Sequence, residues 1–323
     1  MCESPFLGIF SGLLITRARF ELPPSDDVVR AFLAHVRDTG QPETFDLIST
    51  TKPPKDGAVV ALRTSISVPL AKRPLRDRAP CPICSPANPK FLANGTLLWC
   101  ESSKAIYCIG PDCYSTWWDD GRFDQALNAL RRTQQELTNA GKLEAFIAQI
   151  ADQRDWIARN LAQARRIAEL HADLIRSAPK FRGTLSRRLK GSLSTHGVRG
   201  DGFLRGQWPL ERKLTDADRL LVALQHGSRD VSKLSPSAVK ERLQDAARAE
   251  ASLKFVYERM SEAAVFLSAD NMRKLAELGK WDGLMARFDT ISTGLSATIK
   301  AADEHWRTSI GVAAPSPQPV RTL

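Results

Sequence analysis

The sequence predicts an α+β fold: a small N-terminal α/β unit, a cysteine-rich module after it, and then a mainly α-helical coiled-coil body. Three observations predict it. Short runs of alternating apolar residues lie before residue 71, five of the six cysteines lie between 81 and 113, and helical periodicity dominates after residue 118. A chain of 323 residues is long enough for several domains.

Residues 1–70 form the predicted α/β domain. The run LLITRARFEL (13–22) alternates like a strand, Ser25 and Gly40 bracket a helix with acidic residues in its first turn, and GAVVALRTSISVPL (57–70) is a second strand. The early run FLGIFSGLLI is short and follows Glu3 rather than basic residues, so we interpret it as a buried strand and not as an export signal. This favours a reducing, cytoplasmic compartment, where clustered cysteines more often bind metal than form disulfides.

Residues 71–118 contain two cysteine pairs. Cys81 and Cys84 are separated by two residues, and Cys108 and Cys113 by four, with Gly and Pro shaping the second turn. Four thiolates suit the tetrahedral coordination of Zn²⁺ and leave no open position for catalysis. This pattern resembles a zinc ribbon over residues of about 78–118, although the second gap is longer than usual. The resemblance implies a structural zinc held by Cys81, Cys84, Cys108 and Cys113.

The fifth cysteine of this stretch is Cys100. TLLWC and AIYC read as two strands around the loop ESSK, and an even-numbered loop pairs Cys100 with Ala105 and Leu97 with Cys108. Side chains alternate between faces along a strand, so Cys100 is expected on the face opposite Cys108, as the spare cysteine. An odd-numbered loop would reverse this assignment, and free structural cysteines are the alternative for the whole cluster.

Aromatic residues crowd the same module, and Trp117 and Trp118 end it. Such rings can stack on nucleic-acid bases, or they can cover the ribbon and pack it against the next helix. We favour packing, and we keep both tryptophans as candidate nucleic-acid contacts.

Two apolar seams with 3-4 spacing predict a long helix over 119–178 and a helical domain over 214–310, with shorter helices capped by Thr215 and Ser268. We expect the seams to pair with each other or with another copy of the chain, which makes a homo-oligomer or a protein partner possible. The first seam comprises Leu143, Ile147, Ile150, Arg154, Ile157, Leu161, Ala164, Ala168, His171 and Ile175. The second comprises Val239, Leu243, Ala246, Glu250, Leu253, Tyr257, Met260, Ala264 and Leu267. The proline-rich end, 311–323, is predicted to be disordered.

The formal charge of +10 is concentrated in the joint between the seams. Residues 179–213 contain nine Lys or Arg and two acidic residues, with many glycines. Such a segment suits phosphate contacts, although a solvated hinge would have the same composition. The candidate contacts are Lys180, Arg182, Arg187, Arg188, Lys190, Arg199 and Arg205.

Residues 215–243 include LSPSAVKERL and resemble the helix-turn-helix of leucine-responsive-type bacterial regulators. The resemblance implies a recognition helix with Ser235, Ser237 and Lys240 facing DNA. The chain departs from that pattern between Gly227 and Leu234, which is too short for a supporting helix. The same residues also fit a capped helix start in an α-helical bundle.

The sequence therefore favours a bacterial, non-enzymatic protein that binds DNA or RNA, in a regulatory or mobile-element context. The alternative is a protein–protein interaction scaffold with a structural zinc. No Ser-His-Asp order, paired-carboxylate pattern or histidine pair at metal-ligand spacing supports an enzyme.

Overall fold

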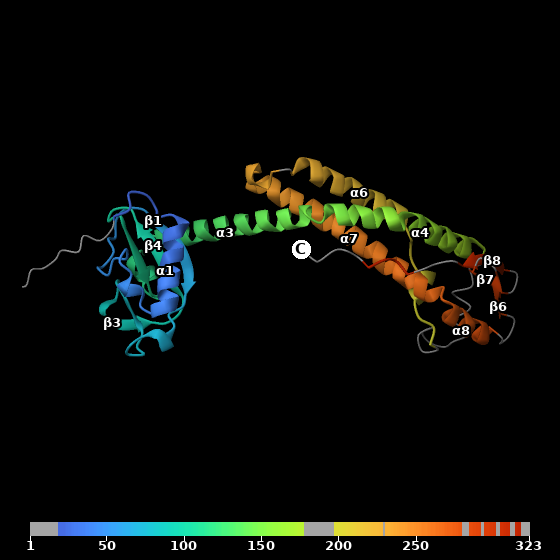
Figure 1. Cartoon of the computed structure of the whole chain (residues 1–323), viewed down its shortest axis with the longest axis horizontal. Helices are drawn as coiled ribbons and strands as arrows, with labels where there is room; N and C mark the ends of the chain where they lie inside the picture. Colours follow the sequence, from blue (N-terminus) through green and yellow to red (C-terminus); the bar gives the residue numbers. More distant parts are fainter. Residues whose placement is uncertain are drawn as a thin grey trace, which may run out of the picture. The chain divides into compact units, whose positions relative to one another are not determined.

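The computed structural model describes residues 19–177, 197–228, 230–279, 284–291, 294–301, 304–310 and 314–317. The chain divides into two compact units, residues 1–136 and 137–323 (Figure 1). The N-terminal unit contains small antiparallel sheets, and the second unit is mostly helical, so the predicted α+β class is confirmed.

Helix α1 (Asp26–Thr39) begins after Ser25 and ends at Gly40, the predicted bounds, although the Ser25 side chain makes no capping hydrogen bond. Gly40 has a φ of 68°, and its N–H donates to the carbonyl of Val36, which closes the helix. Strand β1 (Val59–Ile66) lies within the second predicted strand. Residues 19–22, the described end of the first predicted strand, are not in a strand.

Two sheets follow. Strands β1, β4 (Gly95–Cys100) and β5 (Ala105–Ile109) form one antiparallel sheet with β4 in the middle. Strands β2 (Ala79–Cys81) and β3 (Ser85–Phe91) form a separate hairpin. In the first sheet Cys100 pairs with Ala105, Trp99 with Ile106 and Leu97 with Cys108, which is the register predicted from an even-numbered loop.

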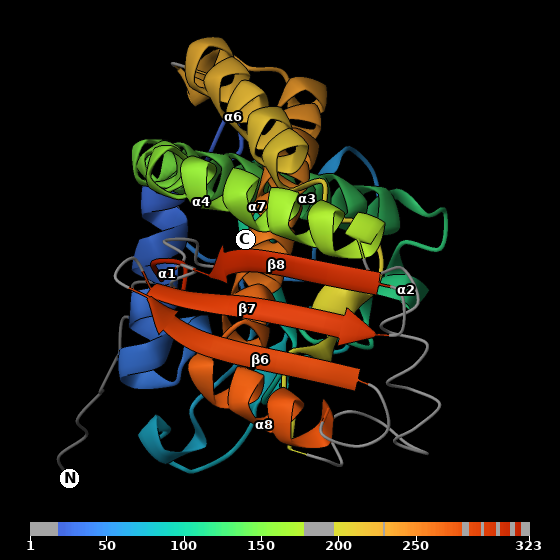
Figure 2. The ribbon, with the colours of Figure 1, turned by 90° about the vertical axis from the view of Figure 1, so that its right-hand side faces the viewer.

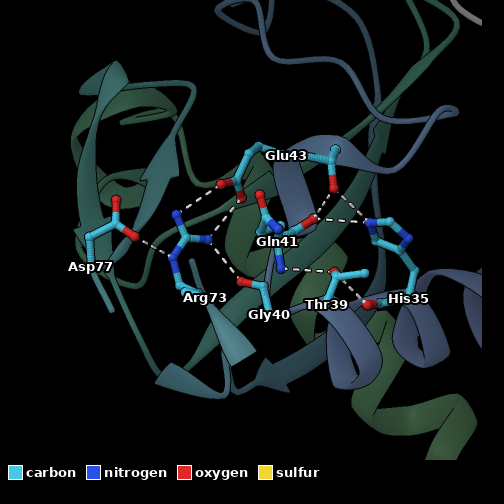
Figure 3. A network of polar contacts seen from close by, with 8 residues as sticks. His35, Thr39, Gly40, Gln41, Glu43, Arg73 and Asp77 are labelled. Carbon is cyan, nitrogen blue, oxygen red and sulfur yellow. Dashed lines mark hydrogen bonds and ion pairs between the residues drawn. The ribbon is translucent and has the colours of Figure 1, made fainter. Parts of the chain in front are cut away.

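A buried arginine organises the segment before β2. The guanidinium of Arg73 donates to the Gly40 carbonyl at 2.8 Å, to both carboxylate oxygens of Glu43 at 2.9 and 3.2 Å, and to Asp77 at 2.8 Å (Figure 3). These bonds connect the end of α1, the 3₁₀ helix η1 (Pro42–Thr44) and the loop after η2 (Leu70–Lys72). A buried charge is tolerated only when its hydrogen bonds are satisfied, and here they are.

One hydrophobic core includes residues from both predicted N-terminal segments, 1–70 and 71–118. Phe32 of α1, Ile66 of β1, Leu97 of β4 and Ile106 of β5 are all buried in it, and so is Phe123 after the cysteine module. The two segments that the sequence separated therefore share a core, because neither buries enough apolar surface by itself.

The helical unit is built from the second part of α3 (Arg122–Ile147), from residue 137 on, and from α4 (Ile150–Ser177), α6 (Leu210–Gly227), α7 (Pro236–Phe266) and α8 (Ala269–Gly279). Two corrections concern helix ends. The predicted helix over 119–178 is interrupted at residues 148–149. Helix α6 begins at Leu210 and not after Thr215. Thr215 lies inside this helix, where its hydroxyl donates to the carbonyl of Glu211. Helix α6 packs against both α4 and α7.

Each predicted seam is half right. In the first seam every seventh residue from Leu143 to His171 is buried, and in the second every seventh residue from Val239 to Leu267 is buried. The remaining residues of each predicted seam are half-buried or exposed, and residues one position earlier in the sequence are buried instead. These buried residues are Phe146, Gln153, Asn160, Ile167 and Leu174 in the first seam, and Ala249, Val256 and Ala263 in the second.

The reason is geometric. Residues at i+3 and i+4 lie on either side of the same helical stripe, and the strict 3-4 spacing chose Leu161 over Asn160, Tyr257 over Val256 and Glu250 over Ala249. The position of the neighbouring elements decides between them. Both helices bury these rows in one core with α6, and coiled-coil pairing between the seams or between chains stays a prediction.

The segment that resembles a helix-turn-helix contains α6, the short 3₁₀ helix η5 (Val231–Lys233) and the start of α7. Ser235 caps α7, accepting a hydrogen bond from the N–H of Ala238 at 3.2 Å, and Pro236 is the first residue of the helix. A single 3₁₀ turn stands where that family has a supporting helix, so the arrangement matches the capped helix start of an α-helical bundle.

The predicted helical domain over 214–310 ends in strands. Strands β6 (Leu284–Ile291), β7 (Gly294–Ala301) and β8 (Glu304–Ile310) form an antiparallel sheet in sequential order, with α8 beside β6 and α4 beside β8 (Figure 2). In the predicted tail, Ser316 accepts hydrogen bonds from Trp156 Nε1 at 3.0 Å and from Asn160 Nδ2 at 3.1 Å, so this part of it is docked on α4.

Within the described ranges, no helix combines the length and apolarity needed to cross a bilayer.

The shifted seam is testable with two adjacent residues of α7. We expect Val256→Asp to lower the free energy of unfolding by about 3–5 kcal/mol, because it places an unpaired charge in the core. Tyr257→Asp, at the half-buried position, should cost much less. Urea denaturation followed by circular dichroism compares the two variants, and an equal or larger loss for Tyr257→Asp would restore the predicted seam.

His171 lies in the core of the helical unit. Its ring stacks on Trp208, with centroids 5.4 Å apart, and meets the edge of Phe203 at 5.5 Å. Its Nε2 atom is buried without a hydrogen-bond partner among the described residues. Burial, together with the nearby charge of Arg259, lowers the pKa of His171 below its usual value. The structure therefore holds this ring in its neutral form.

A pH dependence of stability follows. As the pH falls below about 6.5, the unfolded chain takes up the His171 proton before the folded chain does, so stability should decrease with falling pH. His171→Phe keeps an aromatic ring and removes this proton. Melting temperatures measured between pH 5 and 8 should fall less steeply for the variant, and identical curves would contradict the assignment.

Candidate metal centre

Three cysteine side chains converge in the N-terminal unit. Cys81 ends β2, Cys84 lies in the turn before β3, and Cys113 immediately precedes the short helix α2 (Tyr114–Trp117). Their sulfur atoms all lie within 4.8 Å of one another. Cys81 and Cys113 are buried, and Cys84 is exposed. The hairpin brings the first two together because Cys81 pairs with Ser85 across a tight turn.

The donor set fits a thiophilic metal ion. A Zn–S bond of about 2.3 Å at tetrahedral angles places neighbouring sulfur atoms about 3.8 Å apart, a spacing that these three thiols can reach with small side-chain movements. The Sγ atoms of Cys84 and Cys113 are 2.9 Å apart, too long for a disulfide. The Sγ of Cys81 accepts a hydrogen bond from the N–H of Gly110 at 3.3 Å, a contact that orients this side chain. Three close cysteines could therefore hold a metal ion.

Cys108, the fourth predicted ligand, lies on β5 outside this group of three sulfur atoms. It is buried, and burial raises the pKa of its thiol, to which the nearby Cys81 and Glu43 also contribute. Cys108 is thus near enough to Cys81 for the two thiols to interact electrostatically, without being part of the cluster. The small pocket beside Cys108 is lined by residues of η1 and of the loop that follows it, including Glu43 and Ser49.

Cys100 is not part of the cluster. The register of β4 and β5 places it on the opposite face of the strand pair from Cys108, as predicted. Burial raises the pKa of its thiol to about 12, so it stays protonated at neutral pH. None of the five described cysteines forms a disulfide.

One thiol of the cluster, that of Cys113, favours its protonated form while no metal is bound. Burial raises the pKa of Cys113, and the adjacent thiols of Cys84 and Cys81 add to the effect. A bound cation reverses this preference, because it stabilises thiolates directly and releases their protons.

The two tryptophans differ in their surroundings. Trp118 is buried, and its ring is parallel to that of Phe123 at 6.0 Å, which fits the packing interpretation. Trp117 is half-buried, and its Nε1 donates to the carbonyl of Pro53. The ammonium groups of Lys52 and Lys55 lie 4.1 and 4.7 Å from the centre of the Trp117 ring. Only Trp117 therefore combines partial exposure with neighbouring cations.

Most of the predicted basic joint lies outside the described residues, including Lys180, Arg182, Arg187, Arg188 and Lys190. The remaining two candidates are exposed. The backbone of Arg199 is held by the side chain of Asn271, and Arg205 forms an ion pair with Asp201. Of the seven candidates, the structure thus places Arg199 and Arg205, both in the helical unit.

Sequence reasoning missed Arg73. Its position in the basic run AKRPLRDRAP suggested a solvated linker residue, but it is the one buried cation of that run. Asp77, four residues later, is the one nearby residue in the sequence that could have indicated an ion pair with Arg73. The other partners, Glu43 and the Gly40 carbonyl, are about thirty residues away in sequence.

Comparisons with protein-family models, with curated proteins and with solved structures gave no match to this chain.

Proposed function

We propose that this chain is a nucleic-acid-binding protein that carries a structural zinc ion on Cys81, Cys84, Cys113 and Cys108. The observation that carries the metal assignment is the convergence of three thiols from two turns that are far apart in sequence. Cys108 is the natural fourth ligand because it lies five residues before Cys113 and close to Cys81. A closed set of four thiolates favours Zn²⁺ in a structural role.

The metal would connect elements that otherwise meet weakly. The β2–β3 hairpin is short and pairs irregularly, with shifts in register along its length. A metal held by this hairpin and by the turn after β5 would tie the two together, and structural zinc contributes about 10 kcal/mol to the folding of small modules. The ion would order the surface around it and supply no reaction.

The charge distribution supports nucleic acid as the partner. Seven of the ten net charges belong to residues 179–213, a glycine-rich segment that can follow a phosphate backbone. A scaffold that binds protein through its helices has no need of such a segment.

The metal assignment predicts about one zinc ion per purified chain. Cys81→Ser, Cys113→Ser and Cys108→Ser should each lose most of it, because three thiolates leave the fourth position to water and weaken the site. Cys100→Ser is the matched control and should keep the full complement. Elemental mass spectrometry of freshly purified protein measures both; full zinc in Cys108→Ser would remove that residue from the ligand set, and no zinc in the wild type would refute the site.

Nucleic-acid binding should be steeply salt-dependent. Each phosphate contact contributes about one unit to the slope of log affinity against log salt, so replacing Arg187, Arg188 and Lys190 with Gln should flatten the slope by up to about three units. Trp117→Ala should have a smaller effect on affinity. Fluorescence anisotropy with labelled DNA and RNA tests this, and a triple variant that matches the wild type at every salt concentration would make the joint a plain hinge.

A further inference from the structure

A groove with a volume of about 260 Å³ lies beside the cysteine cluster. One wall comes from the β2–β3 hairpin and the residues just after it, and the other comes from the turn between β5 and Cys113. Its lining residues are Arg78, Lys90, Phe91, Leu92, Ala93, Gly110, Pro111, Asp112 and Cys113. The residue before β2, the end of β3 with the loop after it, and the turn that carries Cys113 therefore form one concave surface, and no residue of the Cys81–Cys84 turn lines it.

Two cations line this groove, Arg78 and Lys90, and Lys90 lies at an irregularity in the hairpin. Ala79 pairs with Phe91 and Pro80 pairs with Pro89, which leaves Lys90 as an extra residue in β3. Such a bulge redirects a side chain and interrupts the pairing. Arg78 directly precedes β2 and is exposed, as is Lys90. The bulge thus concerns Lys90 alone, and both residues line the same groove.

The surroundings are strongly basic. From residue 57 to residue 100 the chain has six basic residues and a single acidic one, Asp77. Asp77 and the more distant Glu43 both accept hydrogen bonds from the buried Arg73 (Figure 3). Their negative charge is therefore compensated internally. Asp112 is the one carboxylate that lines the groove.

Four exposed cations remain around the groove and on the loop leading to it: Lys72, Arg76, Arg78 and Lys90. None of them forms an ion pair with another residue that the structure describes. Arg76 has a φ of 49°, a left-handed conformation that is uncommon for an arginine. Arg76 lies between Arg73 and Asp77, whose side chains are joined by a hydrogen bond, and Arg73 also donates to Gly40 and Glu43. These bonds hold the loop in place, so its cations lie on a fixed backbone and not on a free linker.

We propose that this groove binds neighbouring phosphates of a nucleic-acid backbone, through Arg78 and Lys90, with Arg76 and Lys72 extending the contact along the loop. The inference rests on the proposed nucleic-acid function and names a contact surface for it. An arginine fork and a lysine ammonium are the side chains that bind phosphate oxygens best. Because one wall comes from the hairpin and the other from the turn that carries Cys113, the groove keeps its shape only while the hairpin and that turn are held together.

The test uses the full chain with zinc bound and compares two double variants. Arg78→Gln/Lys90→Gln removes the cations of the groove, and Arg132→Gln/Lys142→Gln removes an exposed arginine and lysine of α3 as a charge-matched control. Affinity for labelled single-stranded and duplex DNA is measured over a range of NaCl concentrations. The groove variant should flatten the salt slope by up to about two units, and the control should change it little.

Melting temperature and zinc content establish that the groove variant is folded. If it is not, Arg78→Lys/Lys90→Arg keeps both charges and should bind like the wild type, whereas Arg78→Gln alone should lose about one unit of slope. A wild-type slope in the folded groove variant would overturn the groove while leaving the proposed function intact. A wild-type chain that binds neither DNA at any salt concentration, but binds an acidic peptide, would overturn both.

Discussion

The N-terminal unit depends on the burial of one guanidinium group. Arg73 is almost completely removed from solvent, and its donors are taken up by the Gly40 carbonyl, Glu43 and Asp77. Desolvating a charge is costly, so the fold is stable only when all these partners are in place together. That requirement determines where α1 ends, where η1 lies and how the loop before β2 runs.

The glycine at the end of α1 belongs to the same constraint. Gly40 has a positive φ, and a Cβ atom there would lie 2.8 Å from the carbonyl oxygen of Pro69. The helix end and the loop carrying Arg73 can approach this closely only because residue 40 has no side chain. The local rule for ending a helix and the long-range ion pair therefore require the same residue.

The cysteine cluster and the basic groove are two consequences of the same arrangement. The loop held by Arg73 leads directly into β2, which ends in Cys81, and the irregular hairpin brings Cys84 back toward Cys113. The bulge that shortens the pairing of this hairpin also places Lys90 at the groove. A metal ion bound by the thiols and a phosphate bound in the groove would thus stabilise neighbouring parts of one surface. The metal ion needs negatively charged thiolates, whereas the phosphate needs positively charged side chains.

The sequence by itself determined the features that depend on neighbouring residues. Rules that act over a few residues explain four of these features: the ends of α1, the capped start of α7, the register of β4 against β5, and the proximity of Cys81 to Cys84. Only the tertiary structure decided that Cys108 lies outside the thiol cluster and that Arg73 is buried. It also decided that Lys90 is the extra residue of a bulge in β3 and that Val256 rather than Tyr257 faces the core. The physical reason is the same in each case. A side chain's environment is set by elements far away in sequence, and the spacing of apolar residues along one helix or strand does not tell which of two adjacent positions those elements cover.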